Sequence, residues 1–250
     1  MTNTVLLGLD VGGSSIKAAL VDTELGRTVT ALQTIPTPSP STPEVVLDLC
    51  AGIDRDLGAR GAVGLAFPSV IQRGVARTAA NIDKSWIGFA GGEHFSKLID
   101  RPVVFINDAD AAGLAEVAAG AGKDVQGVVM LLTFGTGIGS ALFLNGELLP
   151  NTELGHMEFH GVDAELIASA LERTAERLDY PNWCERVNDY LARLHALFWP
   201  DLFIIGGAIS EDFEQYRQLL HSPTEIRRAT YGAQAGVVGA AFAAMRQSRR

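Results

Sequence analysis

Short apolar runs alternate with alanine-rich and amphipathic stretches along this chain, a pattern typical of an α/β protein. Several of the apolar runs are rich in β-branched residues and stop at glycine, proline or a polar pair, as buried strands do. We expect strands at Val5–Asp10, Ile16–Asp22, Val29–Ile35, Ala62–Phe67, Val103–Ile106, Val128–Thr133, Ser140–Asn145 and Leu202–Ile205.

Apolar residues that recur at three and four positions predict the helices. The first helix should begin at Thr42-Pro43-Glu44 and end near Ala59, because threonine is a good cap and proline fits the first helical position. Arg73–Trp86 is polar and is expected to be a loop. We expect the other helices at His94–Ile99, Asp110–Gly120, Asp163–Leu178, Trp183–Phe198, Phe213–Leu220 and Ala235–Met245.

A pattern of strand, glycine loop and strand occurs twice. LLGLD-VGGSSI-KAALVD near the N-terminus is matched by VVMLLT-FGTGIG-SALFLN. Asp10 falls on Thr133 and Gly12 on Gly135, since 133 − 10 and 135 − 12 are both 123. The repeat predicts a duplicated fold with two equivalent lobes.

The stretch VVFINDADAAGLAE, Val103–Glu116, has a polar pair between an apolar strand and a helix-forming run. Ligands of open α/β sheets bind at the carboxyl ends of strands. Asp108 could there accept the proton of a substrate hydroxyl during phosphoryl transfer. It could equally cap the helix that follows, and Asn107 could be an ordinary strand-end residue.

Both glycine loops, and Gly206-Gly207 after a third apolar strand, are candidate phosphate sites. Glycine lets backbone N–H groups point at phosphate oxygens without a Cβ in the way. Neither loop is a Walker A loop, and each alone could be only a hairpin turn. Asp10, at the end of its strand, could hold Mg²⁺ through water or could bond the backbone of its own turn.

The polar segment Glu153–His160 allows two kinds of site. His156, Glu158 and His160 alternate, so on a strand they would share one face and could bind a metal. Carboxylate and imidazole groups also suit the hydroxyls of a sugar. Glu165, at the start of the next helix, could join them or could only supply a favourable charge to its first turn.

The composition restricts the class of partner. With 20 basic and 29 acidic residues the net charge is −9, which argues against binding to nucleic acid or to an anionic membrane. A polyanionic ligand would need a local basic patch. The most basic stretch contains Arg73, Arg77 and Lys84, although Lys84 could be an ordinary solvated residue and the neighbouring Trp86 a core residue.

Compartment and membrane association follow from what the sequence lacks. Cys50 and Cys184 are the only cysteines, so no disulfide framework is expected. The N-terminal residues do not resemble a signal peptide. No apolar run reaches the roughly 20 residues that a membrane span needs. We therefore expect a cytoplasmic protein.

Several motifs, in order along nearly the whole chain, resemble those of the ROK sugar kinases. Within that family the chain is similar to the bacterial glucokinases that use polyphosphate, and AANIDKSW and PNTELGH are the pieces most specific to them. The motifs are LGLDVGGSSIKAALVD, FPSVIQRGVARTAANIDKSWIG, INDADAAGLAE, LTFGTGIGSALF, PNTELGHMEFHG, PDLFIIGGAIS and AGVVGAA.

The resemblance implies a duplicated actin-like ATPase fold, of the hexokinase and ribonuclease H-like type, with the active site between two α/β lobes. The lobes would be 1–108, completed by a C-terminal helix at about 235–250, and 109–234. The reaction would transfer a phosphoryl group from polyphosphate, ATP or both to the 6-hydroxyl of glucose, with Mg²⁺. The family also implies a homodimer.

The same resemblance assigns roles to individual residues. Asp108 would be the general base, and Asp10 would hold Mg²⁺ through water. Asn81, Asn107, Glu153, His156 and Glu165 would bind the sugar. The phosphates would lie against Asp10, Gly12, Gly13, Ser14, Lys17, Thr133, Gly135, Thr136, Gly137, Gly206 and Gly207.

The chain departs from the family pattern at three places. The cysteine-rich zinc motif of many members is absent after His156, so no structural zinc is expected. After Gly207 the similar glucokinases have serine followed by basic residues, whereas this chain has Glu211-Asp212. These acids would repel a polyanion, which leaves the preferred donor open. Residues 223–233 also match poorly.

Two other functions compete with this one. The same side chains could bind another hexose, such as mannose, in an otherwise identical kinase. A non-catalytic sugar-binding regulator of the same family would carry an N-terminal DNA-binding helix-turn-helix. Because the first strand begins by Val5, the sequence offers no room for that motif.

Overall fold

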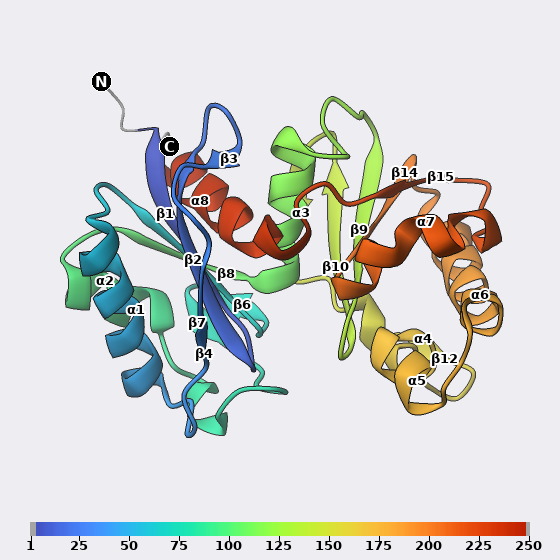
Figure 1. Ribbon diagram of the computed structural model, residues 1–250, viewed down its shortest axis with the longest axis horizontal. Helices are drawn as coiled ribbons and strands as arrows, with labels where there is room; N and C mark the ends of the chain where they lie inside the picture. The colour runs from blue at the N-terminus through green and yellow to red at the C-terminus, as the bar shows by residue number, and fades with distance from the viewer. Residues whose placement is uncertain (1–3, 249–250) are drawn as a thin grey trace. The chain divides into compact units, whose positions relative to one another are not determined.

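The computed structural model describes residues 4–248, which form two compact α/β units (Figure 1). The first unit contains the chain up to Ala119 together with the residues from Gln234 onward, and the second unit is Gly120–Ala233. Each unit has a mixed sheet with helices packed on it. The α/β class predicted from the sequence is confirmed.

The first unit is built on a six-stranded sheet. Its strands are β1 (Val5–Val11), β2 (Ser15–Asp22), β3 (Arg27–Thr28), β4 (Gln33–Pro36), β5 (Val63–Phe67) and β8 (Val103–Asn107). The order is β3-β2-β1-β5-β8, with β4 also paired to β2. β1 is antiparallel to β2 and parallel to β5, and β5 is parallel to β8. The predicted glycine hairpin is thus confirmed.

The second unit repeats the order of the first sheet in five strands, without a counterpart of β4. Its strands are β9 (Val128–Phe134), β10 (Ile138–Leu144), β11 (Glu147–Leu149), β14 (Leu202–Gly206) and β15 (Glu225–Arg228), in the order β11-β10-β9-β14-β15. β9 is antiparallel to β10 and parallel to β14, which is parallel to β15. β1 and β9 also have the same sequence of buried and half-buried positions. The duplication predicted from the repeat is therefore present in the topology.

Helices cover both faces of the first sheet. α1 (Pro43–Leu57) and α2 (Gly91–Ile99) lie on the face that Leu9 and Leu65 share with the main core. α8 (Ala235–Ser248) lies on the opposite face, because side chains alternate along a strand and Gly8 and Gly64 contact its backbone. A Cβ on Gly8 would overlap the carbonyl of Val237, and one on Gly64 that of Ala240.

The sequence analysis expected the first unit to end at Asp108. In the structure its first segment ends at Ala119. α3 (Asp108–Ala119) lies beside α8 (Figure 1). The two helices approach closely, because a Cβ on Gly239 of α8 would overlap the carbonyl of Ala111 in α3. α3 therefore belongs to the first unit. Residues 249–250 of the predicted C-terminal helix lie outside the described residues.

The predicted helix Asp163–Leu178 is wrong as a single element. It is divided into the short strand β13 (Val162–Asp163), α4 (Glu165–Ala168) and α5 (Ala170–Ala175). Ser169 between the helices is extended, and its Oγ accepts a hydrogen bond from the Glu172 N–H. A serine that caps a new helix in this way stops the one before it.

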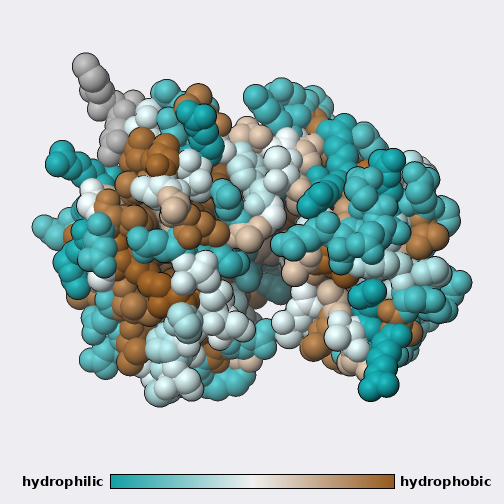
Figure 2. Space-filling model, viewed as in Figure 1, coloured by the Kyte–Doolittle hydropathy of each residue, from teal (hydrophilic) through white to brown (hydrophobic). Residues whose placement is uncertain are grey.

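The other helices differ from prediction mainly at their ends. α6 (Tyr180–Phe198) begins before Trp183, because Asp179 caps it and Pro181 fits its first turn. Its apolar residues face the core, and the surface over it is mainly hydrophilic (Figure 2). α7 (Phe213–Tyr216) is one turn followed by a 3₁₀ turn, rather than the predicted helix to Leu220.

Some short strands lie where the sequence predicted none, and one predicted strand is shorter than expected. Within and beside the predicted loop 73–86 lie β6 (Ile71–Gln72), β7 (Val75–Ala76) and a 3₁₀ turn at Lys84–Trp86. The edge strands β11 and β15 were not predicted. Of the expected strand 29–35 only the last part forms a strand, in β4. Residues 29–32 are not in a strand, and the Thr30 hydroxyl there accepts the Leu20 N–H. No helix within residues 4–248 is long and apolar enough to cross a membrane.

Replacing Gly64 with alanine should lower the free energy of unfolding by about 3 kcal/mol or more, because the new methyl group would force α8 away from β5. Gly52, inside α1, is the matched control. Its nearest neighbour would be the flexible end of Arg55 at 3.9 Å, so Gly52→Ala should raise stability by about 1 kcal/mol. Urea denaturation of both variants checks this, and equal effects would contradict it.

Candidate active site

Polar side chains gather at the carboxyl edge of the first sheet. Asp10 of β1 is in register with Ala66 of β5, which is in register with Ile106 of β8. Asn107 and Asp108 follow directly. Since neighbouring strands are about 4.8 Å apart, Asp10 and the polar pair are separated by about 10 Å across β5. The first unit thus presents two carboxylates and one amide at the end where α/β proteins bind ligands.

Asn107, rather than Asp108, caps α3. Its Oδ1 accepts the Asp110 N–H at 3.0 Å, and its Nδ2 donates to the Ser69 carbonyl at 3.1 Å. Asp108 is the first helical residue, half-buried, and its Oδ1 accepts the N–H of Ala109 at 2.8 Å. Asp108 therefore satisfies one N–H group of the first turn, while Asn107 occupies the capping position before the helix. Asn107 fixes the turn that carries Asp108 and keeps one N–H of its amide for a ligand.

Asp10 is desolvated by the elements around it. Burial raises the pKa of its carboxyl, and the ammonium of Lys17, 3.7 Å away, offsets part of that shift. The first turn of α8 lies against it, because a Cβ on Gly236 would meet the Asp10 carboxyl. A desolvated carboxylate beside one weakly held cation suits a hard metal ion such as Mg²⁺.

The first glycine loop lies against the segment that contains Asn81. The Gly12 N–H donates to the Ser15 carbonyl, and a Cβ on Gly13 would overlap the backbone of Asn81. That segment is held by Trp86, which is fully buried against Phe67 and donates its Nε1–H to a backbone carbonyl. Trp86 is thus a core residue, and it fixes exposed Asn81 beside the loop.

The second glycine loop and the Gly206-Gly207 pair meet at one edge of the second sheet. Thr133 is in register with Gly206, and a Cβ on Gly207 would overlap the backbone of Phe134. The Gly135 N–H closes the loop onto the Gly137 carbonyl at 2.9 Å. The structure therefore brings together the six candidates of this unit for phosphate contact: Thr133, Gly135, Thr136, Gly137, Gly206 and Gly207.

Glu165 joins the glycine loop to the candidate sugar residues. Its Oε2 accepts the Ile138 N–H at 3.2 Å, and a Cβ on Gly137 would overlap its carboxyl. Its Oε1 is 3.6 Å from Nδ1 of His156. One carboxylate thus contacts both the end of the phosphate loop and the imidazole.

Asp163, which the sequence analysis did not select, holds His156. The His156 Nδ1 is 2.9 Å from the Asp163 Oδ2. This hydrogen bond is the largest cause of the raised pKa of His156, and the charges of Glu165 and Glu153 raise it further. The β12 (Glu158–Phe159) and β13 hairpin brings Asp163 there. Local sequence gives no signal of that contact.

Glu153 is the third acid near the imidazole. Desolvation raises the pKa of its carboxyl, the charge of His156 lowers it, and the like charge of Glu165 raises it. With Nδ1 bonded to Asp163, the Nε2 of His156 is left for a ligand. The group therefore offers carboxylate acceptors and an imidazole nitrogen, which suits a polyhydroxylated molecule.

The predicted alternation of His156, Glu158 and His160 on one strand face is wrong. β12 is only two residues long, His160 has a positive φ of 52°, and its ring pairs with Asp189 instead. The Glu158 carboxylate accepts the Gly161 N–H within the hairpin. Within residues 4–248, three side chains whose possible metal-ligand atoms all lie within 4.8 Å of one another are His156, Asp163 and Glu165.

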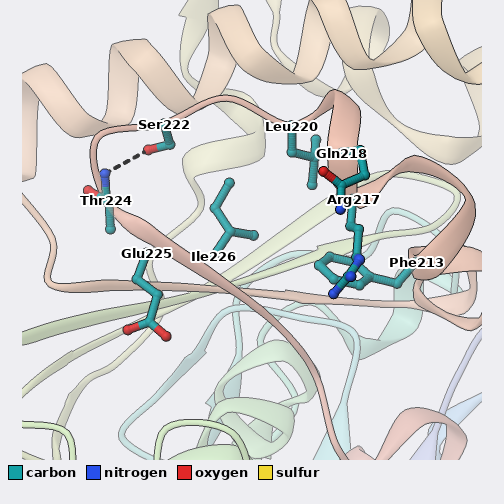
Figure 3. Close-up of a pocket in the computed structure, with 8 residues that line it drawn as sticks. All are labelled: Phe213, Arg217, Gln218, Leu220, Ser222, Thr224, Glu225 and Ile226. Atoms are coloured by element: carbon teal, nitrogen blue, oxygen red, sulfur yellow. Dashed lines mark hydrogen bonds between the residues drawn. The ribbon is translucent and has the colours of Figure 1, made fainter.

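A cavity of about 400 Å³ lies elsewhere in the second unit, lined by residues 213–226 (Figure 3). Thr224 donates its N–H to the Ser222 hydroxyl at the rim. Glu225 pairs with Leu202 at the start of β14, whereas Gly206 ends that strand. Four residues of strand separate the two by about 13 Å, so this cavity is not part of the phosphate site.

The Asp163→Asn substitution should lower the pKa of His156 toward its ordinary value. Because the folded-state pKa is raised, the pair stabilises the fold below about pH 6.5 and stops doing so as the pH rises through the folded-state pKa. The stability lost in the variant should therefore be larger near pH 6 than near pH 8.

Proton NMR titration of His156 and urea denaturation at both pH values check this prediction. Asp189→Asn, which breaks the similar pair with His160, is the control and should leave the titration of His156 unchanged. An unaltered His156 pKa in Asp163→Asn would contradict the assignment.

The sequence profile of the ROK family matches residues 6–174. The chain is 44% identical over 239 residues to a polyphosphate glucokinase of Mycobacterium tuberculosis (strain CDC 1551 / Oshkosh), covering 95% of this chain and 90% of that protein. It is 28% identical to a glucokinase of Streptomyces coelicolor, covering 94% and 96%. The crystal structure of an inorganic polyphosphate/ATP-glucomannokinase from Arthrobacter sp. strain KM matches with a TM-score of 0.92 and 42% identity, over 98% of this chain and 100% of that one. The chain belongs to the ROK family.

Proposed function

We propose that this protein is a glucokinase that transfers a phosphoryl group from inorganic polyphosphate, ATP or both to the 6-hydroxyl of glucose. The observation that carries the proposal is the 44% identity to a polyphosphate glucokinase over 95% of the chain. The chemistry of the two units supports it. One offers a strand-end carboxylate beside a glycine loop, and the other a glycine loop joined by Glu165 to a group of polar side chains.

The two units are the lobes of a duplicated actin-like ATPase fold. This part of the proposal is supported by the equal strand order of the two sheets and by the match of the whole chain to a ROK kinase structure. The glycine loops end equivalent strands, β1 and β9, so each lobe contributes one loop to the phosphates.

Asp108 is the general base. The sugar 6-hydroxyl attacks the terminal phosphorus of the donor, an O–P bond forms, the phosphoanhydride bond breaks, and the hydroxyl proton passes to the Asp108 carboxylate. The Asn107 cap holds the start of α3, so the carboxylate is positioned before substrate arrives. The role of Asp108 is then to accept one proton while the hydroxyl attacks in line with the donor.

The sugar is held by Glu153, His156 and Glu165 from one lobe and by Asn107 and Asn81 from the other. Carboxylates accept hydrogen bonds from hydroxyls, and the Asn107 amide supplies a donor. Asp163 fixes the His156 ring by its 2.9 Å hydrogen bond. A site of this composition discriminates against a sugar that lacks a matching hydroxyl, because one of its polar groups is then left unpaired.

The donor phosphates lie against both glycine loops, including Gly12, Gly13, Ser14 and Thr136. Mg²⁺, held by Asp10 through water, would neutralise part of the donor's charge. Lys17 lies beside Asp10 and adds a second positive charge on that side. We also propose that the protein acts in the cytoplasm, which agrees with two buried free cysteines. The expected homodimer stays a prediction.

Asp108→Asn should bind glucose with near-normal affinity but lose turnover by about 10²-fold or more, because the amide cannot accept the proton. Steady-state kinetics and glucose titration by calorimetry measure the two effects separately. Asp100→Asn is the control. Asp100 is the exposed C-cap residue of α2, and asparagine tolerates its left-handed backbone conformation. Near-normal turnover in Asp108→Asn would refute the role of general base.

A matrix of two donors and two sugars tests the specificity. Polyphosphate and ATP are each supplied with glucose and with mannose, and the sugar phosphate is quantified. We expect product from glucose with at least one donor. Activity with mannose as well would favour the broader kinase, an alternative supported by the similarity to a glucomannokinase. Sugar binding without product from any combination would favour the non-catalytic regulator.

A further inference from the structure

Arg173 in α5 is a half-buried cation whose guanidinium has no hydrogen-bond acceptor and no ion-pair partner among the described residues. In the described part of the chain no carboxylate lies within 4.0 Å of it, and none of its side-chain N–H groups has a protein acceptor. Its Nε is buried and has no hydrogen-bond partner. The nearby Arg186, by contrast, forms a two-point ion pair with Glu176. A fixed, unneutralised guanidinium is what an anionic ligand requires.

The guanidinium is held in place by an aromatic stack. Its Cζ lies 4.0 Å from the centre of the Tyr180 ring. Tyr180 is stacked on buried Tyr216, with ring centres 5.1 Å apart. The Tyr180 hydroxyl donates to the Asp212 carboxylate at 2.7 Å. Because the ring is fixed by two neighbours, the plane of the guanidinium is set before a ligand binds.

This stack stands next to the second glycine loop. Leu171, two residues before Arg173, donates its N–H to the Gly135 carbonyl at 3.0 Å. On the other side, Asp212 ends the 3₁₀ turn that follows Gly207, which packs on the backbone of Phe134. The two segments that carry the stack, α5 and the turn after Gly207, therefore both contact the loop proposed to bind phosphate.

The nearby carboxylates are committed to other bonds. Asp212, which the sequence suggested would repel a polyanion, accepts from Tyr180 and also from the Gln215 amide at 2.8 Å. Asp179 caps α6, and its pKa is lowered by its hydrogen bonds to Asn182 and, to a smaller extent, by the charge of Arg173. Asp212 thus holds the stack and Asp179 caps α6, and neither forms an ion pair with Arg173.

We infer that Arg173, stacked on Tyr180, binds a phosphate of the donor other than the one that is transferred. The ligand is a phosphoanhydride chain, either inorganic polyphosphate or the nucleotide's own phosphates. The inference rests on the proposed function. Arg173 supplies the local basic group that a protein of net charge −9 needs in order to bind a polyanion.

The test compares Arg173→Met with Arg193→Met, an exposed arginine of α6 outside the stack. Arg173→Met should raise the KM for the donor by about tenfold or more, because a charge-assisted hydrogen bond is lost. The KM for glucose and the activity of Arg193→Met should not change. A rise with polyphosphate alone assigns the site to phosphates beyond those of a nucleotide, and a rise with both donors assigns it to a phosphate that both contain.

Two further variants separate binding from structure. Tyr180→Phe keeps the ring but loses the bond to Asp212, so the donor KM should rise less than in Tyr180→Leu, which should behave like Arg173→Met. Arg173→Lys keeps the charge without the planar guanidinium and should give an intermediate KM. If Arg173→Met unfolds, Arg173→Lys and Tyr180→Leu decide the question.

Calorimetric titration measures the Kd for polyphosphate and so tests the inference without relying on turnover. A wild-type protein without kinase activity would refute the proposed function, while a Kd that rises in Arg173→Met alone would still support the site. An unchanged donor KM and an unchanged polyphosphate Kd in folded Arg173→Met would overturn the inference.

Discussion

The first unit depends on the close approach of α8 to the backbone of β1 and β5, which Gly8 and Gly64 permit because they have no Cβ. The contact ties the C-terminal helix to the N-terminal sheet. It also brings Gly236 against Asp10, so the desolvation that raises the pKa of this carboxyl comes partly from the far end of the chain. Helix α3 packs on the same helix, which fixes the base of the turn that carries Asp108.

Charge in the second unit is organised around one imidazole. His156 is near the carboxylates of Glu153, Asp163 and Glu165, and their combined field favours its protonated form. Glu165 also accepts an N–H directly after the glycine loop. A movement of the Glu165 side chain would therefore change its contacts with both the imidazole and the loop. The proposed sugar and phosphate sites of this unit are physically coupled through that carboxylate.

Asp212, one of the two acidic residues after Gly207, has a different role in the structure from the one that the sequence suggested. In the sequence, Glu211-Asp212 is an obstacle to an anionic donor. In the structure Asp212 holds Tyr180, which holds Arg173. A carboxylate that receives two hydrogen bonds repels less than a free one and can serve to orient a cation. The sign of a local charge in the sequence is thus a poor guide to what the site attracts.

Much of the fold followed from local patterns. The apolar strands, the two glycine hairpins and their spacing of 123 residues were readable because strand burial and glycine turns are encoded within a few residues. The carboxyl-edge position of Asp10, Asn107 and Asp108 followed from the same patterns. The short edge strands β11 and β15 were missed, since they are three and four residues long and form by pairing with a neighbour.

By itself, the sequence determined the α/β class, the duplication and the residues at the ends of the central strands, because these depend on hydrophobic periodicity and on where glycine interrupts it. Only the tertiary structure decided that Asn107 caps α3, that Asp163 holds His156, and that Arg173 has no carboxylate partner. Each of these depends on which side chains meet after folding. Hydrogen bonds and ion pairs act over a few ångströms, so their partners are chosen by packing and not by sequence spacing.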